Sequence, residues 1–148
     1  MKKIISLAVC FVMPFVLMGA KNAEDTPPTT SAQAFVLYCP DNNTVICSKN
    51  ADEKMKPAST TKIMTSLITL EEAASCNSEV TFKQEMVAEG SSMYLKVGEK
   101  VRLSDLASGM MMASGNDAAN AAAYTISGSP EKFSQRMNEK AKQIGMTN

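Results

Sequence analysis

Residues 103–127, LSDLASGMMMASGNDAANAAAYTIS, restrict the fold more than any other part of the chain, because two apolar helical runs meet there at a short Ser-Gly-Asn turn. The first run predicts a helix that is capped by Ser104 and ends near Ala113. The methionines at 110–112 are expected to fill the core. The second run is rich in alanine and predicts a closely packed, buried helix.

Two more helices are predicted around this segment. Residues 61–74 carry apolar side chains at helical spacing, and Ser59 is a possible N-cap for them. The predicted buried stripe consists of Ile63, Met64, Leu67, Ile68 and Leu70. Downstream, the run SPEKFSQRMNEKAKQIG predicts a helix with Ser129 as N-cap, an apolar face from Phe133 to Ile144, and its end at Gly145.

A β-hairpin is predicted within FVLYCPDNNTVICS, because two β-rich runs flank the turn-forming residues 40–43. Cys39 and Cys47 fall near opposing positions in it. A disulfide and two free thiols both remain open, since cross-strand geometry often misses the separation that a disulfide needs. Residues 76–98 are irregular apart from a short β-like piece at 80–82, which predicts a loop-rich connection.

The N-terminus has the order of a secretory signal: two lysines, an apolar run, and then the small residues Gly19 and Ala20. We expect a signal peptide over residues 1–20, with a retained N-terminal anchor as the alternative. A flexible linker is predicted over 21–33, where the chain is polar, contains proline and has no periodicity. Folding is predicted to begin near Ala34.

Composition limits the function classes. The chain has 148 residues, of which 45% are apolar, which suits one domain. Its 15 basic and 15 acidic residues form no long block of one sign, so nucleic acid is an unexpected partner. There is no histidine, which excludes Ser-His-Asp and Cys-His mechanisms, and no spacing resembles a metal site.

Ser59 and Lys62 form the first candidate pair. Positions i and i+3 of a helix share a face, so the two side chains can reach one another near the positive end of the helix dipole. Without histidine, the base available to a serine nucleophile is a lysine. The spacing alone is weak evidence, because Ser129 and Lys132 share it and need only ordinary helix-start chemistry there.

The Ser-Gly-Asn turn supplies the second pair. Ser114 and Asn116 lie between two apolar helices, where a hydroxyl can relay protons and an amide can hold a substrate carbonyl or the lysine. A turn of this kind taken alone is more often structural. The similar Ser75-Cys76-Asn77 is expected to serve only as a helix cap.

Together, PASTTKIMT, SSMYLKVGEKVRLSDLASGMMMASGNDAANAAA and MNEKAKQIGMTN resemble the N-terminal part of a D-alanyl-D-alanine carboxypeptidase. These enzymes are low-molecular-weight penicillin-binding proteins of the serine transpeptidase and β-lactamase superfamily. The resemblance covers about residues 34–148 and implies an α+β fold, a β-lactamase/transpeptidase-like helical region plus an antiparallel sheet. It also implies that 34–148 is a partial catalytic domain with an incomplete sheet, truncated before a Lys-Thr-Gly strand.

The resemblance assigns roles to the two candidate pairs. Ser59 would be the nucleophile, Lys62 its base, Ser114 a proton shuttle and Asn116 a substrate-orienting amide. The implied reaction cleaves the bond between the two terminal D-alanines of a peptidoglycan stem peptide in the cell envelope, and β-lactams would acylate the same serine. No cofactor is implied. The protein would work in the periplasm or at the outer face of the cytoplasmic membrane, touching the membrane only peripherally through any C-terminal anchor.

One departure from the family pattern opens alternatives. No lysine in the sequence is followed by Thr-Gly or Ser-Gly, so the third family motif is absent. Loss of a single oxyanion donor costs on the order of 100-fold in rate, and the motif's strand supplies one such donor and flanks the substrate. An inactive exported fragment that binds wall peptide or an envelope partner is therefore an alternative, as is a secreted helical domain with a coincidental Ser-x-x-Lys.

Overall fold

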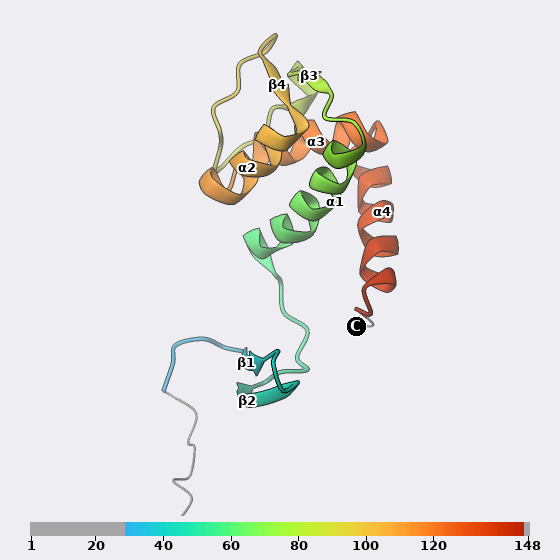
Figure 1. The fold of residues 1–148 in the computed structure, drawn as a ribbon. Helices are drawn as coiled ribbons and strands as arrows, with labels where there is room; N and C mark the ends of the chain where they lie inside the picture. Colours follow the sequence, from blue (N-terminus) through green and yellow to red (C-terminus); the bar gives the residue numbers. More distant parts are fainter. Residues whose placement is uncertain (1–28, 147–148) are drawn as a thin grey trace, which may run out of the picture. The chain divides into compact units, whose positions relative to one another are not determined.

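The computed structural model describes residues 29–146, and the predicted signal peptide and the first part of the predicted linker lie outside the described residues. The chain divides between Met55 and Lys56 into two compact units. Figure 1 shows the hairpin of the first unit and the helices of the second. Strands and helices both occur, and the predicted α+β class is confirmed.

The first unit contains the predicted hairpin. Strand β1 (Phe35–Cys39) pairs antiparallel with β2 (Thr44–Lys49). Residues 29–34 precede the hairpin without regular secondary structure. The last side chain of β2 holds this segment, since Lys49 Nζ donates to the carbonyl of Ala32 at 2.9 Å.

The two hairpin cysteines do not face one another. The register shifts after Leu37, so that Cys47 opposes Leu37 while Cys39 opposes Thr44. Both thiols are free, which settles the question that the sequence left open.

The second unit contains the helices and a second, small antiparallel sheet. Its elements are η1 (Ala58–Thr60), α1 (Thr61–Ser75), β3 (Glu79–Thr81), η2 (Gln84–Met86), β4 (Lys100–Arg102), α2 (Leu103–Ala113), α3 (Asn116–Ser127) and α4 (Pro130–Gln143). Helix α1 contacts each of the other three α-helices, and β3 pairs with β4. Within residues 29–146, none of the helices is both long and apolar enough to cross a membrane.

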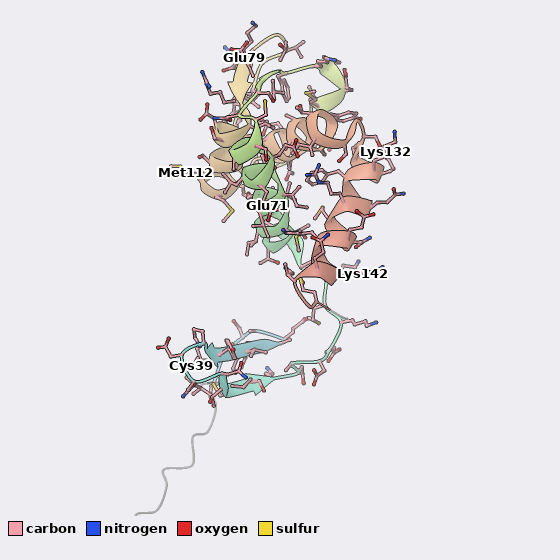
Figure 2. All side chains as sticks on the ribbon, turned by 45° about the vertical axis from the view of Figure 1, so that its right-hand side comes forward. Cys39, Glu71, Glu79, Met112, Lys132 and Lys142 are labelled. Atoms are coloured by element: carbon pink, nitrogen blue, oxygen red, sulfur yellow. The ribbon has the colours of Figure 1, made fainter. Side chains whose placement is uncertain are left out.

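The core centres on α3, as the alanine-rich sequence predicts. Ala118, Ala121 and Ala122 have no exposed surface, and their small side chains let neighbouring elements approach closely. Helix α2 turns the stripe of residues 103, 106, 107 and 110 toward this core. The methionine prediction is correct only for Met110, because Met111 and Met112 fall on other faces of α2. Met112 is 89% exposed and projects away from the helix in Figure 2.

The predicted buried stripe of α1 is largely wrong. Ile68 is buried and Met64 is half-buried, but Ile63, Leu67 and Leu70 are 61%, 37% and 50% exposed. The buried face instead includes Thr65, Ser66 and Thr69. Threonine can be buried there because its hydroxyl bonds the carbonyl one turn back, as Thr69 Oγ1 does with Thr65 O at 2.8 Å.

Two predicted N-caps are wrong and one is confirmed. Helix α1 begins directly after η1, with Thr60 at the N-cap position and no side-chain capping bond, so Ser59 caps nothing. Ser104 lies inside the first turn of α2 and exchanges hydrogen bonds with Asn77. Ser129 does cap α4, since its Oγ accepts a hydrogen bond from Lys132 N at 3.3 Å.

Candidate active site

Ser59 lies in the 3₁₀ turn η1, directly before α1 and exposed to solvent. Ala58 before it has a φ of 45°, which lies in the left-handed region of backbone conformation that residues other than glycine rarely adopt. Strained backbone of this kind persists where surrounding structure holds it, and it gathers at functional sites. The turn places the Ser59 hydroxyl next to the N-terminus of α1, where the helix dipole favours negative charge.

Three of the four predicted site residues meet at the Ser59 hydroxyl. Lys62, half-buried on the first turn of α1, directs Nζ to Ser59 Oγ at 3.4 Å. Ser114 Oγ, 55 residues further along the chain, lies 3.1 Å from the same oxygen. A serine between an amine and a second hydroxyl has both a base and a proton relay within reach.

Ser114 reaches Ser59 because the chain reverses sharply between α2 and α3. Ser114 is the C-cap of α2 and adopts the left-handed conformation, with φ 52° and ψ 34°. Gly115 follows at a point with no room for a side chain. A Cβ there would lie 2.9 Å from Asp117 Oδ1 and 3.2 Å from Met93 N.

Asn116 is held by its amide nitrogen. Its Nδ2 donates to the carbonyl of Glu89 at 2.7 Å, and its backbone N–H donates to the carbonyl of Ser91 at 2.7 Å. A carbonyl oxygen can only accept, so the NH₂ group must face the loop of residues 89–95. Gly90 passes so close that an added Cβ would lie 2.9 Å from Asn116 Nδ2.

Asp117 joins the same loop to the start of α3. Although only 3% exposed, its carboxylate accepts hydrogen bonds from Ser92 Oγ at 2.7 Å, Met93 N at 2.9 Å and Leu95 N at 3.1 Å. The N–H of Ala118 supplies a fourth bond at 2.9 Å. Burial by itself would raise the pKa of Asp117, but these four hydrogen bonds hold the pKa below its ordinary value of 3.8.

A cleft of about 530 Å³ opens beside Ser59 and Lys62. Its lining residues are Ala58, Ser59, Thr61, Lys62, Thr65, Ala88, Asn116, Ala119 and Asn120. Ser114 reaches the site through its hydroxyl contact with Ser59. In the part of the chain that the structure describes, no group of three histidine, cysteine or acidic residues could hold a metal ion.

Two residues of this site, Asn120 and Asp117, were not predicted from the sequence. Asn120 lies one helical turn after Asn116, and that i+4 spacing was a signal for a second amide on the same wall. Asp117 follows Asn116 directly, and an acidic residue in the first turn of a buried helix was a weaker signal. The loop that supplies its hydrogen-bond donors is 22 to 25 residues away in sequence, so the contact itself left no local pattern.

The comparison pair at Ser129 and Lys132 forms no such site. Ser129 Oγ bonds the backbone nitrogen of Lys132, and the Lys132 side chain is exposed on the outer side of α4 (Figure 2). Equal spacing therefore gives two different outcomes. The difference lies in Ser114, which reaches Ser59 from a distant element.

Comparison with known proteins identifies the family. The family model described as D-alanyl-D-alanine carboxypeptidase matches residues 20–148. The chain is 35% identical to the D-alanyl-D-alanine carboxypeptidase DacF of Bacillus subtilis, in an alignment that covers all of this chain and 41% of the relative. It is 38% identical to DacC of Escherichia coli, with 85% of this chain and 35% of the relative covered.

Solved structures of the same family share the fold. The D-alanyl-D-alanine carboxypeptidase DacD from Francisella tularensis superposes with a TM-score of 0.76 and 36% identity, covering 82% of this chain and 30% of that one. A D-alanyl-D-alanine carboxypeptidase from Mycobacterium tuberculosis gives 0.76 and 31%, covering 84% and 47%. The chain thus spans less than half the length of these relatives. It belongs to the D-alanyl-D-alanine carboxypeptidase family.

Proposed function

We propose that this chain carries the nucleophile and base of a serine-type D-alanyl-D-alanine carboxypeptidase, which acts on peptidoglycan stem peptides through an acyl-enzyme on Ser59. The observation that supports it is the convergence of Lys62 Nζ and Ser114 Oγ on Ser59 Oγ beside an open cleft. The names of the relatives supply the substrate class.

The first half-reaction forms an ester. The Lys62 amine takes the Ser59 proton, and Ser59 Oγ attacks the carbonyl carbon between the two terminal D-alanines. The C–N bond breaks, and the proton passes from Lys62 through Ser114 to the nitrogen of the departing D-alanine. Water then attacks the ester carbon, and its proton passes through the same groups to Ser59 Oγ. The bond between Ser59 Oγ and the acyl carbon breaks, which releases the shortened peptide as a carboxylic acid.

The same geometry accounts for the proposed reaction with β-lactams. Ser59 would attack the strained lactam carbonyl and open the ring, so that the nitrogen which leaves stays tethered to the acyl group. Asn116 lines the cleft beside Lys62 and would orient the acyl chain of either ligand through the amide oxygen that the Glu89 contact leaves free.

The work of the protein is proposed to take place outside the cytoplasm. Residues 1–20 would direct export, and the cell envelope is where peptidoglycan stem peptides are found. The proposed site is the periplasm or the outer face of the cytoplasmic membrane, with a role in cell-wall metabolism and cell shape.

We also propose an alternative function, a domain that binds wall peptide without cleaving it. The 148 residues of this sequence contain no Lys-Thr-Gly, the motif that the family resemblance associates with binding of a substrate carboxylate. An inactive domain that binds wall peptide would keep the cleft and lack turnover. It predicts that Ser59→Ala leaves peptide binding unchanged.

Release of D-alanine from a peptide ending in D-Ala-D-Ala tests the proposed activity. The purified chain, Ser59→Ala and Ser129→Ala are compared at equal concentration. Release that is lost only in Ser59→Ala supports the carboxypeptidase. Absence of release, together with peptide binding that survives Ser59→Ala, would favour the binding function.

A further inference from the structure

We propose that Asp117 is a positioning residue of this site, whose carboxylate holds the loop of residues 89–95 against α3 and so fixes the Asn116 amide at the cleft. The inference extends the proposed function, because it concerns the same cleft. It assigns a task to the most buried acidic side chain among residues 29–146.

Hydrogen bonds attach the loop to α3 through two adjacent residues, Asn116 and Asp117. Three donors of the loop, from Ser92, Met93 and Leu95, bond the Asp117 carboxylate. Ser92 Oγ accepts in turn from Tyr94 N at 2.8 Å, which closes the loop around the carboxylate. Tyr94 has a φ of 64°, a left-handed conformation that this tight arrangement imposes.

The other end of the loop holds Asn116. The carbonyls of Glu89 and Ser91 accept from the side chain and the backbone of Asn116. Any displacement of the loop therefore moves the acceptor that orients the amide. The two attachments are adjacent in the loop, because Ser91 accepts from Asn116 and the next residue, Ser92, donates to Asp117.

Met93 locks the loop against α2 as well. Its side chain lies over Gly109, where an added Cβ would come within 1.8 Å of the Met93 sulfur. The backbone N–H of the same Met93 bonds Asp117. The loop is thus held to α2 by the Met93 side chain and to α3 by Asp117, which lies two residues before Ala119 and three before Asn120 on the cleft wall.

The negative charge of Asp117 is stabilised by hydrogen-bond donors rather than by a cation. No lysine or arginine of the described residues forms an ion pair with it, and each carboxylate oxygen accepts two bonds. An amide of the same shape cannot accept all four bonds, because an NH₂ group at either oxygen position would face at least one backbone N–H donor. Asp117→Asn is therefore a sharp test that changes no packing volume.

Nuclear magnetic resonance of the full chain measures directly whether Asp117 fixes the Asn116 amide and the loop. In Asp117→Asn we expect the Asn116 side-chain amide resonances to move toward free values. Hydrogen exchange at the Met93 and Leu95 amides should accelerate by about tenfold or more. Asp105→Asn is the matched control, since Asp105 lies in the first turn of α2 but is exposed, and it should change neither.

A milder variant keeps the test decisive if Asp117→Asn does not fold. Ser92→Ala removes one of the four bonds and should move the same resonances in the same direction by a smaller amount. The proposal is overturned if either folded variant leaves the Asn116 resonances where the wild type has them, because a merely structural role predicts lower stability with an unchanged amide.

Penicillin acylation supplies the functional readout. If the wild type is acylated at Ser59, Asp117→Asn should slow acylation by about 100-fold, the scale expected for a small misplacement of a substrate-orienting group. A normal rate in a variant whose amide has moved would also overturn the positioning role. If the wild type itself is never acylated, the proposed function fails, whereas the resonance measurements still decide whether Asp117 positions Asn116.

Discussion

The two sides of the candidate site are built in opposite ways. Ser59 and Lys62 lie at the solvent-facing start of α1, joined by a single hydrogen bond of 3.4 Å and without a helix cap. Ser114 to Asp117 form a turn with a left-handed residue, a glycine that admits no side chain, and a buried carboxylate with four hydrogen bonds. We infer that the first side supplies the reactive groups while the second fixes the geometry in which they act.

The largest expected difference between the two sides is in stability. Asp117→Ala leaves three half-buried donors of the loop and the N–H of Ala118 without their acceptor, which should lower the free energy of unfolding by about 3 kcal/mol. Ser59→Ala should change it by less than about 0.5 kcal/mol, because Ser59 is exposed. Urea unfolding followed by circular dichroism measures both, and equal losses would remove the contrast.

Gly109 tests how tightly the loop beside the Ser114 to Asp117 turn is packed, because the Met93 side chain of the loop lies over it. Gly109→Ala pushes a methyl group into the Met93 side chain and should cost about 2 kcal/mol by overpacking. Thermal unfolding checks the loss, with the exposed neighbour variant Ser108→Ala as a control that should be near neutral. Adding Met93→Ala should return part of the loss, and strictly additive effects would contradict the contact.

The third prediction separates the two Ser-x-x-Lys pairs. Ser129→Ala removes the N-cap of α4 and should cost about 1 kcal/mol, whereas Ser59→Ala removes no cap. The same unfolding measurements compare them. If Ser59→Ala were as costly as Ser129→Ala, Ser59 would be a helix cap and the contrast with the turn would weaken.

The smallest effect is a dependence on pH. Because the folded state holds the pKa of Asp117 below 3.8, its contribution to stability is fully present above that pH and is lost as pH falls through the lower folded pKa. The stability gap between wild type and Asp117→Asn should therefore narrow below about pH 4. A gap that stays constant down to pH 2 would show that the charge is not what matters.

The sequence predicts the parts of this molecule that have local causes. The hairpin, the alanine-rich α3 and the start of α4 each follow from turn residues, composition or capping chemistry, and each is confirmed. The contact between Ser59 and Lys62 likewise follows from their i, i+3 spacing, which places the two side chains on one face of a helical turn.

The predictions that are wrong, and the residue that was not predicted, depend mainly on contacts between parts of the chain that are distant in sequence. The buried face of α1 is set by where the other three helices lie, so Thr65 and Thr69 are buried while Ile63 is exposed. Ser59 could be mistaken for a cap because η1, a separate turn before the helix, left no clear pattern. Asp117 was missed because its partners lie in an irregular loop earlier in the chain.

The most direct test of the account is the intact mass of the purified chain after exposure to a penicillin. The wild type and Ser129→Ala are predicted to gain the mass of one penicillin molecule, and Ser59→Ala is predicted to gain nothing. Such a result would show that Ser59, Lys62 and Ser114 are assembled into a reactive group. No adduct on wild-type chain that circular dichroism shows to be folded would contradict the central claim that this chain presents a working nucleophile.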